Sequence, residues 1–474
     1  MSEPVRPFET NAAPTLRLAD VERLYPRYSG PGPRYTSYPT VPVWSDAFGP
    51  QDHEAALRAI DPSEELSVYA HVPFCHSLCH FCACNRVITR DPEVPERYLD
   101  AIDRELATVA AKIEGRPRVG QLHWGGGTPT HLDPGQLERL FDSIASRVEI
   151  LGDAELSVEV DPRVTSEDQI ETLARLGFNR LSLGVQDTDR KTQEAIHRIQ
   201  PFEQTLALTE TARARGITGI NYDLVYGLPH QTVASMRRTL DEVLSARPDR
   251  IALYGYAHVT WVAKQQRGFE RGDLPDPSRR LALFLEASGR LLDAGYRWIG
   301  MDHFALEDDA LTHALDDGTL RRNFMGYTTR VGTDVLAFGP SAISQLGDAY
   351  VQAEKDLGDW TAAANDGRLP TALGHRLTPD DVARRHLIEQ IMCMGRVEAN
   401  DLRERFGSDF HAGYLRELER LAPLVEDGLV EISPTGDLLV LPIGRVFLRN
   451  VAMAFDAHLA RDEDAPGRLF SQTV

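Results

Sequence analysis

Four of the five cysteines in this chain lie within ten residues, at Cys75, Cys79, Cys82 and Cys84, in the stretch "YAHVPFCHSLCHFCACNRV". Their spacing is C-x3-C-x2-C-x-C, and only one cysteine lies outside it. Chance grouping is therefore a poor explanation. Cysteine thiolates bind zinc and iron–sulfur clusters, so the sequence predicts a metal centre of one of these two kinds.

The spacing leaves both kinds of centre open. Structural zinc sites commonly use two cysteine pairs a dozen or more residues apart. Here Cys79 and Cys82 form one such pair, and His71, His76 or His80 would have to complete the site. A C-x3-C-x2-C loop can instead wrap a cubic cluster with three thiolates. The fourth iron then stays open and can chelate a small amino acid through its amine and carboxylate.

Two further stretches carry polar or ligand-accessible groups at the ends of expected strands. In "WGGGTPT", Gly125, Gly126 and Gly127 remove side chains, so a ligand could approach the backbone. In "SVEVDPR", Glu159 could accept hydrogen bonds from both hydroxyls of a ribose. A tight turn and an ion-paired glutamate are the simpler alternatives for these two stretches.

The elements that must position these residues follow from the hydrophobic pattern. Short apolar runs rich in β-formers alternate with amphipathic helical stretches such as 96–113 and 235–246. The runs cover residues 66–72, 119–124, 154–160, 179–185, 219–227, 249–257 and 296–304. This alternation predicts parallel strands in a full or partial barrel, with functional groups at the carboxyl ends of the strands. The cysteine loop, the glycine turn and Glu159 fall at three successive ends.

We expect three regions along the chain. Residues 1–55 are rich in Pro, Gly and Tyr and should cover the open end of the site. Residues 56–369 should form the catalytic barrel and its extension. Residues 370–474 mix helices with a hairpin, as a winged helix does, and Cys393 should be a buried core thiol there.

Composition excludes several classes of function. The formal net charge is −20, which argues against nucleic acid or an anionic membrane as the main partner. No apolar run is long enough to cross a bilayer, and the N-terminus lacks the apolar segment of a secretory signal. We therefore expect a cytoplasmic protein, in which an odd number of cysteines argues against a disulfide framework.

The cysteine stretch resembles the signature of the radical S-adenosylmethionine (SAM) enzymes, and more narrowly that of the oxygen-independent coproporphyrinogen III oxidase family. The similarity continues over nearly the whole chain, through "YSGPGPRYTSYPT", "QLHWGGGTPTHL", "ELSVEVDPR", "NRLSLGVQD", "NYDLVYGLPHQT", "GMDHFA" and "RNFMGYTT". It implies an α/β fold: a partial (β/α) TIM-like radical SAM barrel, an N-terminal cover segment and a mainly helical, winged-helix-like C-terminal domain. One departure is Ala83, where the family usually has glycine.

The resemblance also implies roles for individual residues. Cys75, Cys79 and Cys82 would bind a [4Fe-4S] cluster, and Cys84 would be catalytic, with Tyr69 and His71. One SAM would bind the cluster and contact Tyr69, Gly126, Glu159 and Ile343. A second SAM would contact Phe81, Gly127, Thr128, Gln186, Arg198, Asp223 and Ala257.

The implied reaction is oxidative decarboxylation of two propionates of coproporphyrinogen III, giving protoporphyrinogen IX in haem biosynthesis. Candidate substrate contacts are Arg34, Tyr35, Tyr38, Arg321 and Arg322. A flavodoxin or ferredoxin would donate electrons, and we expect a monomer. Three alternatives remain: a haem chaperone of the same superfamily, which usually lacks the residue equivalent to Cys84, a radical SAM methyltransferase, and a zinc-stabilised binding protein.

Overall fold

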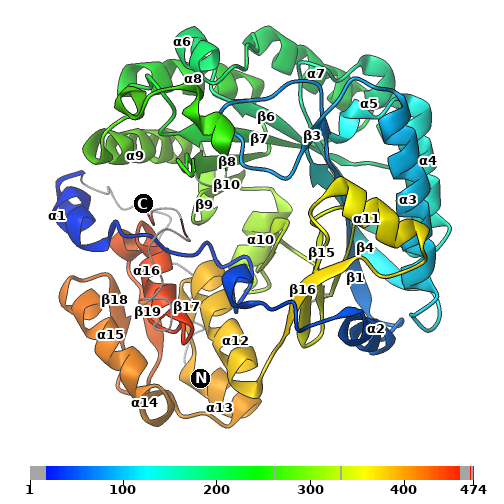
Figure 1. The fold of residues 1–474 in the computed structure, drawn as a ribbon. Coiled ribbons are helices and arrows are strands. Elements are labelled where there is room, and N and C mark those ends of the chain that lie inside the picture. Colours follow the sequence, from blue (N-terminus) through cyan, green and yellow to red (C-terminus); the bar gives the residue numbers. More distant parts are fainter. Residues whose placement is uncertain (1–17, 261–262, 331–333, 460–469, 471–472, 474) are drawn as a thin grey trace.

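The computed structural model describes residues 18–260, 263–330, 334–459, 470 and 473. Among these residues, the main sheet has twelve strands (Figure 1). In spatial order they are β16 (Thr371–Arg376), β15 (Ala349–Ala353), β14 (Ile343–Leu346), β13 (Val335–Phe338), β1 (Glu65–Val72), β4 (Arg118–Gly126), β5 (Glu149–Val160), β6 (Arg180–Gln186), β7 (Gly219–Tyr226), β8 (Arg250–Gly255), β10 (His303–Leu306) and β9 (Tyr296–Gly300).

Strands β13, β1 and β4 to β8 are parallel, as the alternation of strands and helices predicts. Antiparallel strands extend this core at both sides, and the edge strands β16 and β9 do not pair with each other. The fold is therefore a partial barrel with a gap, which confirms the expected α/β architecture.

One expected strand is wrong. Residues 296–304 were predicted to form a single run in the parallel series, but they belong to the antiparallel pair β9 and β10. Met301 lies between the two strands and has a φ of +38°, which reverses the chain. The hydrophobic pattern alone did not reveal this turn, although Gly300 and Asp302, which flank Met301, are of types that favour turns.

Helices cover the outer face of the barrel (Figure 1). They are α3 (Glu93–Ala110), α4 (Pro134–Ala145), α5 (Glu167–Arg175), α6 (Arg190–Ala195), α7 (Phe202–Ala214), α8 (Val233–Ala246), α9 (Pro277–Asp293) and α11 (Leu357–Asn365). Helix α10 (Ala310–Asp316) lies inside this ring of helices and contacts β9 and β10 (Figure 1). Several begin at side-chain caps: Asp133, Ser166 and Thr232 each accept a hydrogen bond from a backbone N–H in the first turn. Such caps stabilise a helix by about 1 kcal/mol and fix where it begins.

The inner face of the barrel is polar because side chains alternate along each strand. On β6, Leu181, Leu183 and Val185 are buried, while Arg180 and Ser182 alternate with them and are half-buried. The same alternation gives every central strand a row of polar side chains, and these rows face one lumen. The sequence thus builds a barrel whose interior can bind polar ligands.

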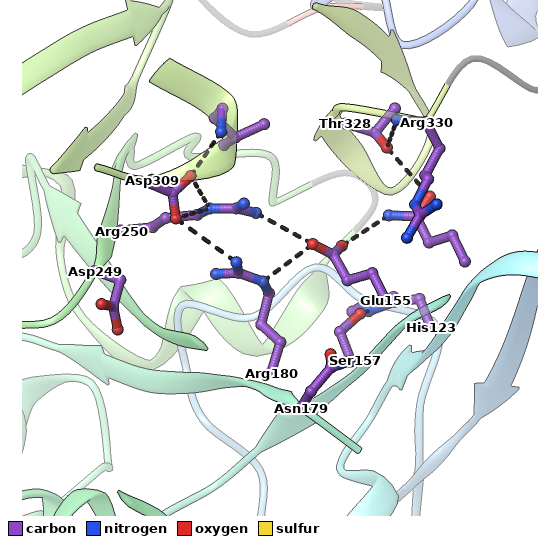
Figure 2. A network of polar contacts seen from close by, with 12 residues as sticks. His123, Glu155, Ser157, Asn179, Arg180, Asp249, Arg250, Asp309, Thr328 and Arg330 are labelled. Carbon is purple, nitrogen blue, oxygen red and sulfur yellow. Dashed lines mark hydrogen bonds and ion pairs between the residues drawn. The ribbon is translucent and has the colours of Figure 1, made fainter. Parts of the chain in front are cut away.

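Buried charges lie in the barrel near the amino-terminal ends of β6 and β8 (Figure 2). Arg250 donates from Nε to Asp309 at 2.8 Å, and Arg180 donates from Nε to Glu155 at 3.1 Å. Arg180 and Arg250 also lie 3.6 Å and 3.8 Å from the opposite carboxylates. Gln121 on β4 donates to Glu155 at 3.0 Å and so joins the same network.

The gap in the barrel is covered by segments from both ends of the chain. Helix α1 (Leu18–Tyr28) leads into residues 29–49, here called the strap, which runs across the gap to α2 (Pro50–Arg58) (Figure 1). The hairpin of β11 (Arg321–Asn323) and β12 (Gly326–Thr328) and helix α12 (Pro379–Met394) contact each other beside it. Residues 1–17 of the expected cover segment lie outside the described residues.

The C-terminal region has the expected mixture of helices and a small sheet. It contains α12, α13 (Ala399–Phe406), α14 (Phe410–Gly413), α15 (Leu415–Glu426), α16 (Leu448–Met453) and the strands β17 (Arg396–Val397), β18 (Val430–Ile432) and β19 (Leu438–Val440). The main sheet continues through β16, so this region begins after Arg376. Cys393 is 1% exposed. Within the described residues, we find no helix with the length and apolar character that a membrane span requires.

Candidate active site

The cysteine loop follows β1 and is fixed at both ends. The short strands β2 (Phe74–Cys75) and β3 (Val87–Ile88) pair and close the loop. His71, at the end of β1, lies 2.9 Å from the Asn85 carbonyl through Nε2 and 3.0 Å from the Tyr69 hydroxyl through Nδ1. Because a carbonyl only accepts, Nε2 carries the proton and Nδ1 accepts from Tyr69. His71 thus positions the loop directly after Cys84.

The cysteine side chains gather beside the glycine turn. The Cys75 and Thr128 side chains lie 3.5 Å apart, and the Cys82 sulfur accepts the backbone N–H of Cys84 at 3.4 Å. Burial is the main cause that raises the pKa of the Cys75 thiol to about 11; the hydrogen bond with Thr128 opposes it, while Cys82 and Cys79 add to it. These three thiols are therefore electrostatic neighbours. Within the described residues, no three His, Cys, Asp or Glu side chains are arranged to hold a single metal ion.

Two guanidinium groups lie against the Cys79 sulfur. Arg163 approaches it with Nη2 at 3.4 Å and Arg198 with Nη1 at 3.6 Å. Asp161 holds both arginines, at 2.6 Å and 3.0 Å. Burial alone would raise the pKa of Asp161, but Arg198 and Arg163 outweigh it and lower the pKa to about 2. Two positively charged side chains therefore contact the Cys79 sulfur.

Sequence reasoning missed Arg163 and Asp161. Both belong to the "EVDPR" stretch, from which only Glu159 was selected. The sequence does show two oppositely charged residues directly after the end of β5, and this pattern could have indicated that they belong to the site. The contact of Arg163 with Cys79 depends on how the cysteine loop folds back over β5 and β6, which spacing along the chain does not determine.

The glycine turn is required by close packing. Gly126 has a φ of +116°, and a Cβ there would lie 2.7 Å from the His71 ring. A Cβ on Gly127 would lie 2.7 Å from the backbone of Pro73 and Phe74. The turn therefore packs directly against the start of the cysteine loop. Ala83 is not among the described residues with a positive φ, so its methyl group causes no backbone strain.

A group of acids and aromatic rings lines the lumen near Cys84. Glu159 accepts the Gly126 N–H at 3.1 Å and lies 3.6 Å from Nε2 of His123, while its side chain remains 44% exposed. Tyr69 stacks on His123. Burial raises the pKa of Tyr69 well above its usual value, and Glu159 and Cys84 raise it further, so these groups are close together.

The residues expected around a second SAM lie on the neighbouring strands. Asp223 accepts from Ser182 at 3.0 Å and Asn221 at 2.9 Å. Burial, and then Glu159, raise its pKa to about 7. Arg198 donates to the Gly184 carbonyl at 2.7 Å, two residues before Gln186. Asp223 and Arg198 therefore both lie beside β6 and β7, on the side that faces the lumen.

Two expected ligand positions are joined by a residue that the sequence did not suggest. Gln266 donates to the carbonyl oxygens of Phe81 and Ala257, at 2.9 Å and 3.0 Å. Its side chain therefore ties the cysteine loop to the end of β8. Ile343, expected at the first SAM, begins β14, which is separated from β1 by one strand of the sheet.

The expected substrate contacts separate into two cavities. Tyr35, Tyr38, Arg321 and Arg322 line one of about 70 Å³. Arg34 lines another of about 50 Å³, where it pairs with Asp302 and lies 5.6 Å from the Tyr254 ring centroid. The structure thus brings four of the five residues together.

Comparison with known proteins agrees with this geometry. Residues 69–243 match the model of the Radical SAM superfamily. The chain is 42% identical over 438 residues to the oxygen-independent coproporphyrinogen III oxidase of Escherichia coli (strain K12), covering 92% of this chain and 95% of that protein. The chain belongs to the oxygen-independent coproporphyrinogen III oxidase family.

Other members of the oxygen-independent coproporphyrinogen III oxidase family extend the match. The Synechocystis sp. protein is 37% identical over 470 residues, with 98% of this chain and all of that protein covered. The solved structure of coproporphyrinogen III oxidase from Escherichia coli, described as a radical SAM enzyme, superposes with a TM-score of 0.87 at 41% identity. It covers 90% of this chain and 97% of that chain.

The residues of this family member fit a [4Fe-4S] cluster and SAM. Three neighbouring thiols, with two guanidinium groups at one of them, suit an anionic cluster bound by thiolates. The close-packed glycine turn and the partly exposed Glu159 carboxylate offer hydrogen-bond partners for a polar ligand beside it.

Proposed function

We propose that this protein converts coproporphyrinogen III to protoporphyrinogen IX by oxidative decarboxylation of two propionate side chains to vinyl groups, as a step of haem biosynthesis. The observation that carries the proposal is the 42% identity to the E. coli coproporphyrinogen III oxidase over 92% of the chain. Each conversion removes one hydrogen atom from the propionate β-carbon, one electron and CO2.

In this proposal Cys75, Cys79 and Cys82 hold the cluster. When bound, the reduced cluster and SAM supply one-electron radical chemistry at a C–H bond. Arg163 and Arg198 both contact the Cys79 sulfur, and their positive charges would face the negative charge of a bound cluster there. His71 holds the loop through Asn85, so that Cys84 stays at the lumen.

Cys84 lies where it can act on the reacting side chain. Unlike Cys79, which is 8% exposed, Cys84 is exposed, and it neighbours Glu159 and Tyr69. In this proposal its thiol assists hydrogen or electron transfer at the lumen without being needed to bind iron. This role separates the proposal from the haem-chaperone alternative, since that branch usually lacks this cysteine.

The proposal includes two SAM molecules per chain. Tyr69, Gly126, Glu159 and Ile343 would contact the first. The second would contact Phe81, Gly127, Thr128, Gln186, Arg198, Asp223 and Ala257. Among the described residues, none accepts a hydrogen bond from the buried Nε of Arg198, which suits a carboxylate ligand at that atom.

Anaerobic turnover tests the function. The reconstituted protein, supplied with SAM, with reduced flavodoxin or ferredoxin as the proposed donor, and with an external one-electron acceptor for the electron that each decarboxylation releases, should convert coproporphyrinogen III to protoporphyrinogen IX. Cys75→Ser should abolish turnover, and Cys393→Ser is the matched control, because that thiol is buried far along the chain in α12. Absence of product from the fully loaded wild type would refute the proposal. Sedimentation should show a monomer.

A further inference from the structure

The cavity of about 70 Å³ lies where the strap meets the β11–β12 hairpin and α12, and is here called the basic cavity. Three arginines line it, Arg321, Arg322 and Arg385, but only one acid, Glu389. The lining therefore carries an excess of positive charge. The volume exceeds the roughly 30 Å³ that a water molecule occupies in the liquid, but it is far too small for a tetrapyrrole ring. It suits a group the size of a carboxylate.

Arg322 is the cavity residue whose hydrogen-bonding capacity is least used. Its Nη2 donates to the Arg34 carbonyl at a long 3.4 Å, and its guanidinium lies 4.7 Å from the Tyr327 ring centroid. Nε and Nη1 are buried, and no described residue accepts from either. A buried donor without a partner is destabilising, so an anion in the cavity that accepts from Arg322 would remove this penalty.

The strap directs neighbouring side chains into different cavities. Tyr35 has a φ of +47°, a conformation that costs a non-glycine residue about 1 kcal/mol or more. Arg34 thereby lines the cavity near Asp302, while Tyr35 lines the basic cavity. The Tyr35 hydroxyl donates to Asp456 at 3.0 Å, and the Tyr38 hydroxyl accepts the Ala457 N–H at 3.1 Å. Both rings are thus held as fixed walls.

The basic cavity adjoins the lumen through shared residues. Thr328 lines the cavity and donates to Gln121 at 3.4 Å, and Gln121 lies on the inner face of β4. No residue of the cysteine loop lines the cavity. A ligand group in the basic cavity would therefore lie beside the barrel lumen and away from the cluster.

We propose that the basic cavity binds a carboxylate of the substrate that does not react, and so anchors the tetrapyrrole while another propionate enters the lumen. This inference rests on the proposed function, whose substrate carries four propionates and keeps two. Arg322 is the main contact, with Arg321 and Arg385 adding charge. Glu389 opposes the bound carboxylate.

Fluorescence titration of the loaded enzyme with coproporphyrin III tests the subsite. Arg322→Gln should raise Kd roughly 10- to 100-fold, the loss expected for hydrogen bonds between charged groups. Arg322→Lys should recover part of the affinity, since it restores the charge. Arg368→Gln, at an exposed ion pair with Asp366, is the matched control and should leave Kd unchanged. An unchanged Kd in Arg322→Gln would overturn the proposal.

Two further arms separate charge from packing. The uncharged tetra-amide of coproporphyrin III should bind wild type and Arg322→Gln equally. Glu389→Gln should bind coproporphyrin III more tightly than wild type at pH 8, because it removes the opposing carboxylate. The cavity has only a packing role, and the proposal is wrong, in either of two cases. One is that Glu389→Gln weakens binding as Arg322→Gln does. The other is that Arg322→Gln costs the tetra-amide as much affinity as it costs coproporphyrin III.

The outcome is distinguishable from failure of the proposed function. If wild type converts coproporphyrinogen III and Arg322→Gln binds the porphyrin normally, the subsite fails while the function stands. If wild type binds coproporphyrin III through Arg322 but yields no protoporphyrinogen, the function fails. Should Arg322→Gln not fold, as judged by circular dichroism and iron content, Arg385→Gln replaces it, with a raised Kd again expected and an unchanged one contradicting the proposal.

Discussion

Replacing Glu155 by Gln should strongly destabilise the barrel without removing its cofactors. Arg180 and Arg250 each pair with two acids, Glu155 and Asp309 (Figure 2). One nitrogen of each arginine, Nη1 of Arg180 and Nη2 of Arg250, already lacks a partner among the described residues. Because no spare acceptor exists there, Glu155→Gln leaves Asp309 as the only carboxylate for two buried guanidinium groups.

The magnitude follows from the pKa of Glu155. Burial would raise this pKa, but Arg250 and Arg180 outweigh burial and lower it from 4.5 to about 2. At about 1.4 kcal/mol per pKa unit, the ionised carboxylate contributes roughly 3 kcal/mol to the free energy of unfolding. Because the folded pKa is depressed, this contribution is complete above about pH 4.5 and is lost as the pH falls toward 2.

Urea unfolding of the metal-free protein, followed by circular dichroism, measures this difference. At pH 7 Glu155→Gln should be less stable than wild type by about 3 kcal/mol, and the gap should shrink below pH 4.5. Glu138→Gln is the matched control, because Glu138 pairs with Arg175 at the exposed surface and should contribute at most about 1 kcal/mol. A loss in Glu155→Gln no larger than in the control, or a gap that is independent of pH, would refute the reasoning.

Three further predictions concern the reaction chamber. Cys84→Ser should keep its iron and lose decarboxylation, whereas Cys75→Ser should lose iron. Iron counts per chain and turnover, both measured anaerobically, test this prediction. Loss of iron in Cys84→Ser would contradict it. Arg198→Ala should keep the cluster and one SAM but lose the second, at a cost of roughly 2–5 kcal/mol in binding. Labelled SAM at equilibrium measures the stoichiometry, and two bound SAM with normal turnover in Arg198→Ala would argue against Arg198 as a contact of the second SAM. Air should bleach the visible absorption and release iron, so activity that survives prolonged aeration would contradict an open-iron cluster.

The sequence predicted the parallel barrel because period-2 strands and amphipathic helices alternate over most of the chain. It also placed the cysteine loop, the glycine turn and Glu159 at neighbouring strand ends, where the structure finds them. These features depend on local pattern and on the general rule that parallel strands align their carboxyl ends.

Features that depend on folding back over the barrel were missed. Arg163 contacts Cys79 across three strand ends and is held there by Asp161, and Gln266 joins Phe81 to Ala257. These contacts join residues far apart along the chain, and no local periodicity encodes them. The antiparallel turn at Met301 is local, but the continuous apolar run hid it although Gly300 and Asp302 flank Met301.

The most direct test of the account is the release of labelled CO2 during anaerobic turnover of coproporphyrinogen III that carries label in its propionate carboxyl groups. The fully loaded wild type should release two CO2 for each protoporphyrinogen IX formed, and Cys84→Ser should release none. Consumption of SAM with methylation of the porphyrinogen and no CO2, or stable haem binding without conversion, would contradict the account.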